Sequence, residues 1–172
     1  MNRLKLVSIG ASLFSLFLLS SQSHASADRT IHIYNQSSKT IKVVPTNQTR
    51  MNITQQSTSM PILKPGQEGS YRIHDNGDFG NSDDRLDQQS VTFSVSDVAT
   101  NSTLGNFEFH HAWDSDAHIF GDYFTTIVAD NGLYGKMKAA CGADHNPCLW
   151  NNDFTWIGDA HNADAVVELY QP

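Results

Sequence analysis

Residues 90–98 read Ser-Val-Thr-Phe-Ser-Val-Ser-Asp-Val, with apolar and polar side chains in alternation. Val91, Phe93 and Val95 fall on one side of an extended chain, and the polar residues between them fall on the other, because side chains alternate along a strand. A strand with one apolar face needs a second layer to cover that face. This stretch therefore predicts a half-buried strand in an all-β protein.

The same two-residue period recurs between turns rich in Gly, Asn, Asp and Ser, and no helical period is sustained after residue 27. Residues 30–34 and 40–44 are expected to form an N-terminal hairpin. A second hairpin is expected around the Asp130-Asn131-Gly132 turn. Residues 46–60 are interpreted as a loop or weak strand, followed by a tight turn at Pro65-Gly66. Further strands are predicted at residues 69–74, 103–111 and 165–170.

These runs amount to roughly eight or nine short strands, the number typical of an antiparallel β-sandwich. A small closed β-barrel is the alternative, because it also buries one face of each strand. The chain shows neither an internal repeat nor a linker-like stretch. Residues 28–172 are therefore predicted to form a single domain.

The first twenty-seven residues have the three-part layout of a secretory signal peptide. Arg3 and Lys5 precede a mostly apolar run over residues 6–19, and Ala25-Ser26-Ala27 forms a small-x-small cleavage site. A retained anchor is the weaker alternative, because a spanning helix needs about twenty apolar residues. We expect a mature chain that starts at Asp28, has no transmembrane segment and is secreted to the extracellular space or periplasm.

Two cysteines, Cys141 and Cys148, are the only ones in the chain. A disulfide bond between them is expected, because exported compartments are oxidising. The alternative is a metal site that uses both thiols, with His145 as a third ligand.

The mature chain is acidic: eighteen Asp and Glu residues face nine Lys and Arg residues, which gives a net charge near −9. Such a surface repels nucleic-acid backbones and anionic headgroups. The charge balance therefore argues against nucleic acid as a partner and leaves neutral lipids, glycans, cations or another protein.

Residues 110–118 hold three imidazoles and two carboxylates, in the order His-His-Ala-Trp-Asp-Ser-Asp-Ala-His. Imidazole suits Zn or Cu. His110 and His111 point to opposite faces of a strand, so a metal site needs a bend after Ala112. The alternative is a strand end with solvated polar side chains. The candidate ligands are His110, Asp114, Asp116 and His118.

Residues 75–84 form a second candidate cation site. They include four Asp and two Asn residues with interspersed glycines. Calcium is bound by six to eight oxygens from such groups. The loop lacks the spacing of the helix-loop-helix calcium motif, and an ordinary acidic turn is the alternative.

Aromatic residues are the third candidate. Trp113, Trp150 and Trp156 lie in segments expected to be loops or strand ends, and Asn151 and Asn152 follow the second of them. Exposed rings stack on sugars or sit at a membrane boundary. The alternative is that these rings cover the ends of the hydrophobic core.

Catalytic templates are scarce. The sequence has no Gly-x-Ser-x-Gly, no His-Glu-x-x-His and no phosphate-binding glycine loop. A non-catalytic protein is therefore favoured, and an enzyme with an unrecognised site remains the alternative.

Three stretches after residue 28 follow one another in a recognisable order: Arg29-Thr30-Ile31-His32-Ile33-Tyr34-Asn35, Ile62-Leu63-Lys64-Pro65-Gly66, and Phe107-Glu108-Phe109 through Trp113-Asp114 to Gly121. This order resembles the aegerolysin-like β-sandwich proteins, which are small, acidic and often exported. The resemblance implies recognition of membrane lipids, sometimes with a partner protein that forms the pore.

Together these features predict a secreted, non-catalytic binding module that recognises membrane lipids or glycans through exposed aromatic side chains and has no cofactor. The alternative is a secreted protein or enzyme that depends on Ca, Zn or Cu bound around residues 110–118.

Overall fold

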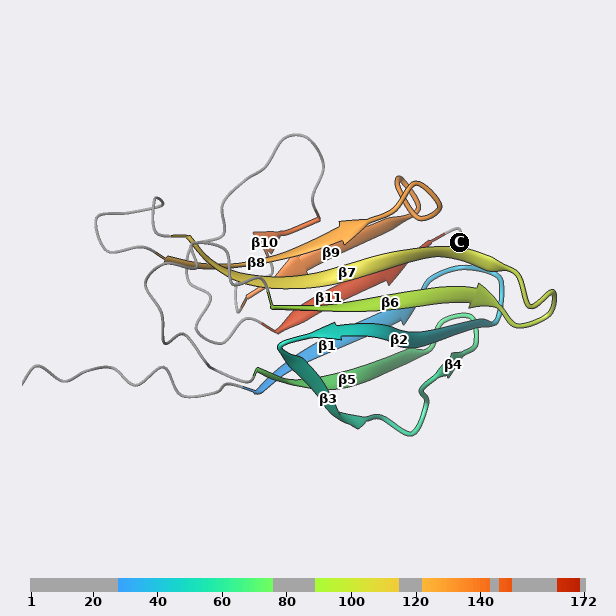
Figure 1. The fold of residues 1–172 in the computed structure, drawn as a ribbon. Coiled ribbons are helices and arrows are strands. Elements are labelled where there is room, and N and C mark those ends of the chain that lie inside the picture. The colour runs from blue at the N-terminus through green and yellow to red at the C-terminus, as the bar shows by residue number, and fades with distance from the viewer. Residues whose placement is uncertain (1–27, 76–88, 115–121, 143–145, 150–163, 171–172) are drawn as a thin grey trace, which may run out of the picture.

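Two stacked β-sheets make up the computed structural model of the protein (Figure 1). It describes residues 28–75, 89–114, 122–142, 146–149 and 164–170, and these residues contain no helix. The expected signal peptide lies outside them, so that assignment remains a prediction.

Sheet A has six strands in the described part of the chain, and all but one of its neighbouring pairs are antiparallel. The exception is the parallel pair in which Ile33 lies opposite Val167. In spatial order the strands are β10 (Asn146–Pro147), β9 (Met137–Cys141), β11 (Ala165–Leu169), β1 (Asp28–Asn35), β5 (Glu68–Asp75) and β3 (Met51–Gln56).

Sheet B has five described strands, and every pair is antiparallel. Val91, Phe93 and Val95 of its central strand are fully buried, which confirms the prediction made from residues 90–98. The strands, in spatial order, are β4 (Ile62–Leu63), β2 (Ile41–Thr49), β6 (Gln89–Asp97), β7 (Thr103–Asp114) and β8 (Asp122–Ala129).

The core lies between the inner faces of the two sheets. Phe93 stacks on Phe107 with ring centroids 5.1 Å apart, and Tyr71 of sheet A lies 5.3 Å from Phe93. The Tyr71 hydroxyl crosses the core and donates to the Val43 carbonyl at 2.7 Å. The described sheets do not close on one another, so the fold is a β-sandwich and the barrel alternative is wrong.

The expected N-terminal hairpin is also wrong, because β1 lies in sheet A and β2 in sheet B. The chain crosses between the sheets around Asn35, which is fully buried. Its amide donates to the carbonyls of Lys39 and Leu63, and its side-chain oxygen accepts from Ser37. The buried side-chain amide of Asn35 thus supplies hydrogen-bond partners to backbone groups at the crossover.

The second expected hairpin is wrong for the same reason: β8 belongs to sheet B and β9 to sheet A. The predicted turn does form, because the Asp130 carboxylate accepts from the backbone of Asn106, Gly132 and Leu133. The sequence can therefore predict a turn correctly without predicting which strands pair with the two strands that flank it.

The polar stretch over residues 46–60 contains more strand than expected, because β2 continues to Thr49 and β3 follows at Met51. The tight turn at Pro65-Gly66 is confirmed. Gly66 has a φ of 75°, and Gln67 N donates to the Lys64 carbonyl at 3.0 Å.

The expected disulfide is confirmed: Cys141 and Cys148 are bonded, with their Cα atoms 5.7 Å apart. Both sulfurs are therefore occupied, so the alternative metal site made from these thiols is wrong. Ile127 N donates to the Cys148 carbonyl at 2.9 Å, which ties the disulfide loop to sheet B. The bond is compatible with an oxidising compartment.

Candidate functional site

The outer face of sheet A carries the candidate site. Thr30, His32 and Tyr34 face outward from β1, because Ile31 and Ile33 occupy the inward positions. The outward residues lie between matched positions on β11 and β5.

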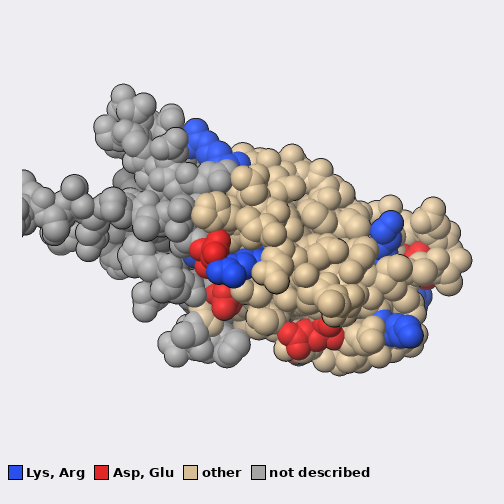
Figure 2. All heavy atoms as spheres, turned by 90° about the horizontal axis from the view of Figure 1, so that it is seen from below, with Lys and Arg blue, Asp and Glu red and all other residues tan. Residues whose placement is uncertain are grey.

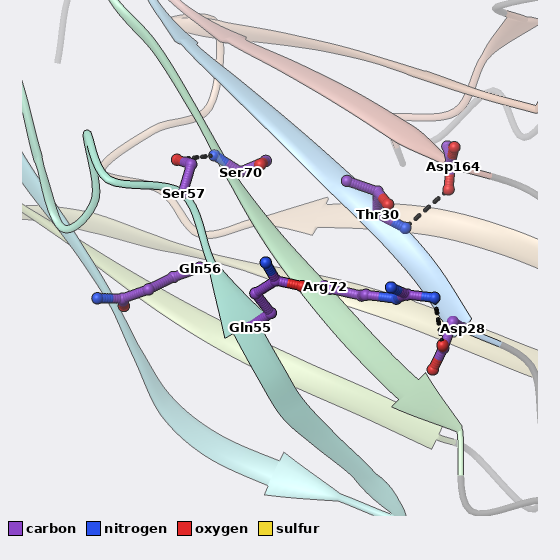
Figure 3. Close-up of a pocket in the computed structure, with 8 residues that line it drawn as sticks. All are labelled: Asp28, Thr30, Gln55, Gln56, Ser57, Ser70, Arg72 and Asp164. Carbon is purple, nitrogen blue, oxygen red and sulfur yellow. Dashed lines mark hydrogen bonds and ion pairs between the residues drawn. The ribbon is translucent and has the colours of Figure 1, made fainter.

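A polar hollow of about 540 Å³ opens on this face (Figure 3). It lies across β1, β5 and β3, and the segment before β11 completes it. The described side chains that line it are all polar: Asp28, Thr30, Gln55, Gln56, Ser57, Ser70, Arg72 and Asp164.

An ion-paired group forms one end of the polar hollow. Arg72 Nη2 lies 2.6 Å from Asp28 Oδ2, and His74 Nδ1 donates to Asp28 Oδ1 at 2.8 Å. The hydrogen bond from His74, together with the charge of Arg72, lowers the pKa of Asp28 below its usual 3.8. Asp28 is therefore a carboxylate at neutral pH and accepts hydrogen bonds.

Backbone contacts fix the rest of the polar hollow. Thr30 N donates to Asp164 Oδ1 at 2.7 Å, and Ser70 N donates to Ser57 Oγ at 2.9 Å (Figure 3). These bonds attach the segment before β11 to β1, and the residue that follows β3 to β5. The positions of the polar groups are thus set before any ligand arrives.

A β-bulge in β3 decides which side chain stands beside Arg72. The register shifts between Ile53 and Gln55, so Gln55 rather than Thr54 lies opposite Arg72. Bulges often redirect side chains at functional sites. Here the bulge places a longer amide, with both a donor and an acceptor, beside the guanidinium.

The polar hollow carries charges of both signs, with two carboxylates, Asp28 and Asp164, and one guanidinium, Arg72. Arg72 is paired with Asp28, and Asp164 is held by a backbone N–H. Figure 2 shows one face of the molecule, on which acidic and basic side chains lie next to one another and large areas carry no charge. Such a site suits an uncharged ligand rich in hydrogen-bonding groups.

Hydrogen-bonded carboxylates extend along the same face. His32 Nδ1 donates to Glu68 Oε1 at 2.7 Å. The hydrogen bond with Glu68 raises the pKa of Tyr34, and a hydrogen bond from the hydroxyl of Tyr170 to Glu168 raises the pKa of Tyr170. These phenols stay protonated at neutral pH.

The residues predicted from the sequence lie elsewhere. Trp113 and Asp114 end β7, where their backbone pairs with Tyr123 and Asp122. The remaining predicted residues, Asp116, His118, Trp150, Asn151, Asn152 and Trp156, fall outside the described ranges. The aromatic surface and the metal site therefore remain predictions, as does the calcium loop, of which only Asp75 is in a described strand.

Two of the candidate histidines are described, and they do point to opposite sides as expected. His111 is buried in the core, whereas the His110 side chain lies on the outer face with Nε2 3.3 Å from Glu108 Oε2. Among the described residues no cluster of three or more His, Cys, Asp or Glu side chains is arranged to hold a metal ion.

The polar hollow was missed from the sequence, although two signals were present. Arg72 and His74 alternate with buried residues along β5, which shows that they face outward. The polar stretch around Gln55 and Gln56, for which the sequence leaves a loop or a weak strand open, is the edge strand β3 and adds its side chains to the same face.

No protein-family model matches this chain, and no curated protein matches it. The resemblance to the aegerolysin-like proteins thus remains a prediction. In the described ranges no helix has both the length and the apolar character needed to cross a membrane.

Proposed function

We propose that the mature protein is a secreted, non-catalytic module that binds an uncharged glycan in the polar hollow. The observation that supports this proposal is the lining of the hollow, in which the eight described side chains are all polar, around about 540 Å³. Amides, hydroxyls and carboxylates supply the donors and acceptors that sugar hydroxyls require. The pre-formed contacts around Thr30 and Ser70 reduce the ordering that binding would otherwise demand.

The state of Asp28 argues against one catalytic role for this residue, that of a general acid. A general acid at neutral pH needs a raised pKa, as in glycoside hydrolases. The pKa of Asp28 is lowered instead, because His74 and Arg72 stabilise its charged form. Asp28 is suited to accept hydrogen bonds from sugar hydroxyls and not to donate a proton.

The test is calorimetric titration with neutral oligosaccharides selected on a glycan array. Gln55→Ala and Ser70→Ala should each weaken binding about tenfold, since each removes one or two hydrogen bonds. Ser94→Ala is the matched control, because Ser94 is half-buried on the outer face of sheet B. Failure of every neutral glycan to bind, or equal affinity in all three variants, would overturn the proposal.

The same titration separates the predicted aromatic surface from the polar hollow. Trp113→Ala and Trp156→Ala should leave binding unchanged if the polar hollow holds the ligand. Loss of binding in these variants and not in Gln55→Ala would move the site to the tryptophans. Metal analysis of purified protein, with and without chelator, tests the alternative of a metal-dependent protein.

A further inference from the structure

We propose that a second, apolar subsite on the outer face of sheet A binds the alkyl chain of the glycan's carrier, so that the ligand is an uncharged amphiphilic glycoside. This proposal rests on the proposed glycan function and names its ligand class. The subsite is an apolar groove of about 430 Å³, lined by Lys138, Ala139, Ala140, Pro147, Leu149, Val166 and Glu168.

The floor of the apolar groove is built from small and apolar residues that face away from the core. Val166 of β11 lies opposite Ala140 of β9, and both are only half-buried. Pro147, from the disulfide loop, and Leu149, which directly follows Cys148, also line the groove. These half-buried or exposed side chains give the described part of this sheet face an apolar strip beside its polar residues.

The apolar groove and the polar hollow adjoin along one segment of chain. Asp164 lines the polar hollow and Val166 lines the apolar groove. Two residues along an extended chain span about 6.6 Å. A sugar bound beside Asp164 therefore lies within a few bond lengths of the groove, which places an attached alkyl chain over Val166.

The charges at the apolar groove select an uncharged chain. Lys138 and Glu168 lie opposite each other in the register, so their charges cancel. Both also have partners of their own: the Tyr170 hydroxyl donates to Glu168, and Lys138 Nζ lies 5.0 Å from the centre of the Tyr170 ring. The groove thus offers an apolar floor with no free charge of one sign, which matches a neutral chain and not a fatty-acid carboxylate.

The test compares methyl, hexyl and octyl glycosides of glucose, galactose and maltose by calorimetry, with each kept below its micelle concentration. Each buried methylene should tighten binding up to about fourfold until the apolar groove is filled. The octyl glycosides should therefore bind at least tenfold more tightly than their methyl counterparts.

Substitutions on the outer faces of sheets A and B test where the alkyl chain binds. Val166→Thr keeps the shape and strand preference of the side chain and should reduce octyl binding at least threefold without changing methyl binding. Val128→Thr is the matched control, because Val128 is half-buried on the outer face of sheet B, and it should change neither. Gln55→Ala should weaken both ligands equally.

The outcomes separate this proposal from the glycan function. Equal affinity for methyl and octyl glycosides, or an octyl preference that is as large in Val166→Thr as in the wild type, would overturn the apolar groove and leave the glycan site standing. Octyl binding that is lost in Val166→Thr, with no methyl glycoside bound, would support the groove and overturn the glycan function.

Discussion

Arg29 of β1 and His111 of β7 contact each other through the core, with Nη2 2.8 Å from Nε2, and so join the two sheets. Both residues are almost fully buried, at 3% and 1% exposure. A guanidinium has donors only, so Nε2 of His111 must accept. The ring proton is therefore assigned to Nδ1, which lies 3.0 Å from Thr125 Oγ1.

This contact predicts a large difference between neighbouring histidines. His111→Phe removes an acceptor from the buried guanidinium and should lower the free energy of unfolding by about 1–3 kcal/mol. His110→Phe, on the outer face, should cost less than about 1 kcal/mol, because its ion pair with Glu108 is partly exposed. Urea denaturation measures both. Equal losses in the two variants would show that the contact with Arg29 contributes nothing specific.

The inward position of Arg29 illustrates where sequence reasoning succeeds and stops. Alternation predicted the buried faces of β1, β5, β6, β7 and β11, because hydrophobic burial on one side imposes a two-residue period. By the same alternation Arg29 and His111 fall on the buried faces, beside Ile31 and Phe109. Their partners come from distant segments, so the sequence cannot reveal that each one satisfies the other.

The two wrong hairpins have a related cause. A strand has the same alternation whether its successor pairs with it or crosses to the opposite sheet, because one face is buried in both cases. The crossovers are set by Asn35 and Asp130, whose side chains bond to backbone groups far away in the sequence. The polar hollow depends equally on long-range register, since the residues that line it come from separate strands and the segment before β11.

Tyr71 predicts a specific loss of stability in alkali. Burial raises its pKa to about 12, against 10.0 for an ordinary tyrosine. The folded state holds this proton more tightly than the unfolded state, so the free energy of unfolding should fall as the pH rises from 10 to 12. In Tyr71→Phe the fall should be shallower, as measured by urea denaturation at each pH.

The control for this prediction is Tyr134→Phe, because Tyr134 is 57% exposed. This variant should follow the wild type at every pH. At neutral pH, Tyr71→Phe should also cost about 1 kcal/mol, since the Val43 carbonyl loses its hydrogen bond. Parallel pH curves for wild type and Tyr71→Phe would contradict the assignment.

Asp28 predicts the opposite sign in acid. Its folded pKa is lowered by His74 and Arg72, so its contribution to stability is present above the usual 3.8 and is lost as the pH falls through the folded value. Asp28→Asn removes this titration, and its stability should depend less on pH between 5 and 2. Thermal denaturation over that range is the measurement, and an identical acid dependence in the two proteins would refute it.

Removal of the disulfide should affect the apolar groove and the polar hollow of sheet A differently. The loop it closes has a sequence separation of 7, and chain entropy gives such a short loop about 2.5 kcal/mol. A Cys141→Ala, Cys148→Ala double variant should lose about this much in urea denaturation, and reductant should have no further effect on it. Pro147 of the apolar groove lies in this loop and Leu149 directly follows it, whereas the described residues that line the polar hollow do not come from it. Under conditions where the variant is fully folded, it should bind methyl glycosides as the wild type does and lose part of its preference for octyl glycosides. Loss of methyl glycoside binding as well would show that the two subsites are not independent.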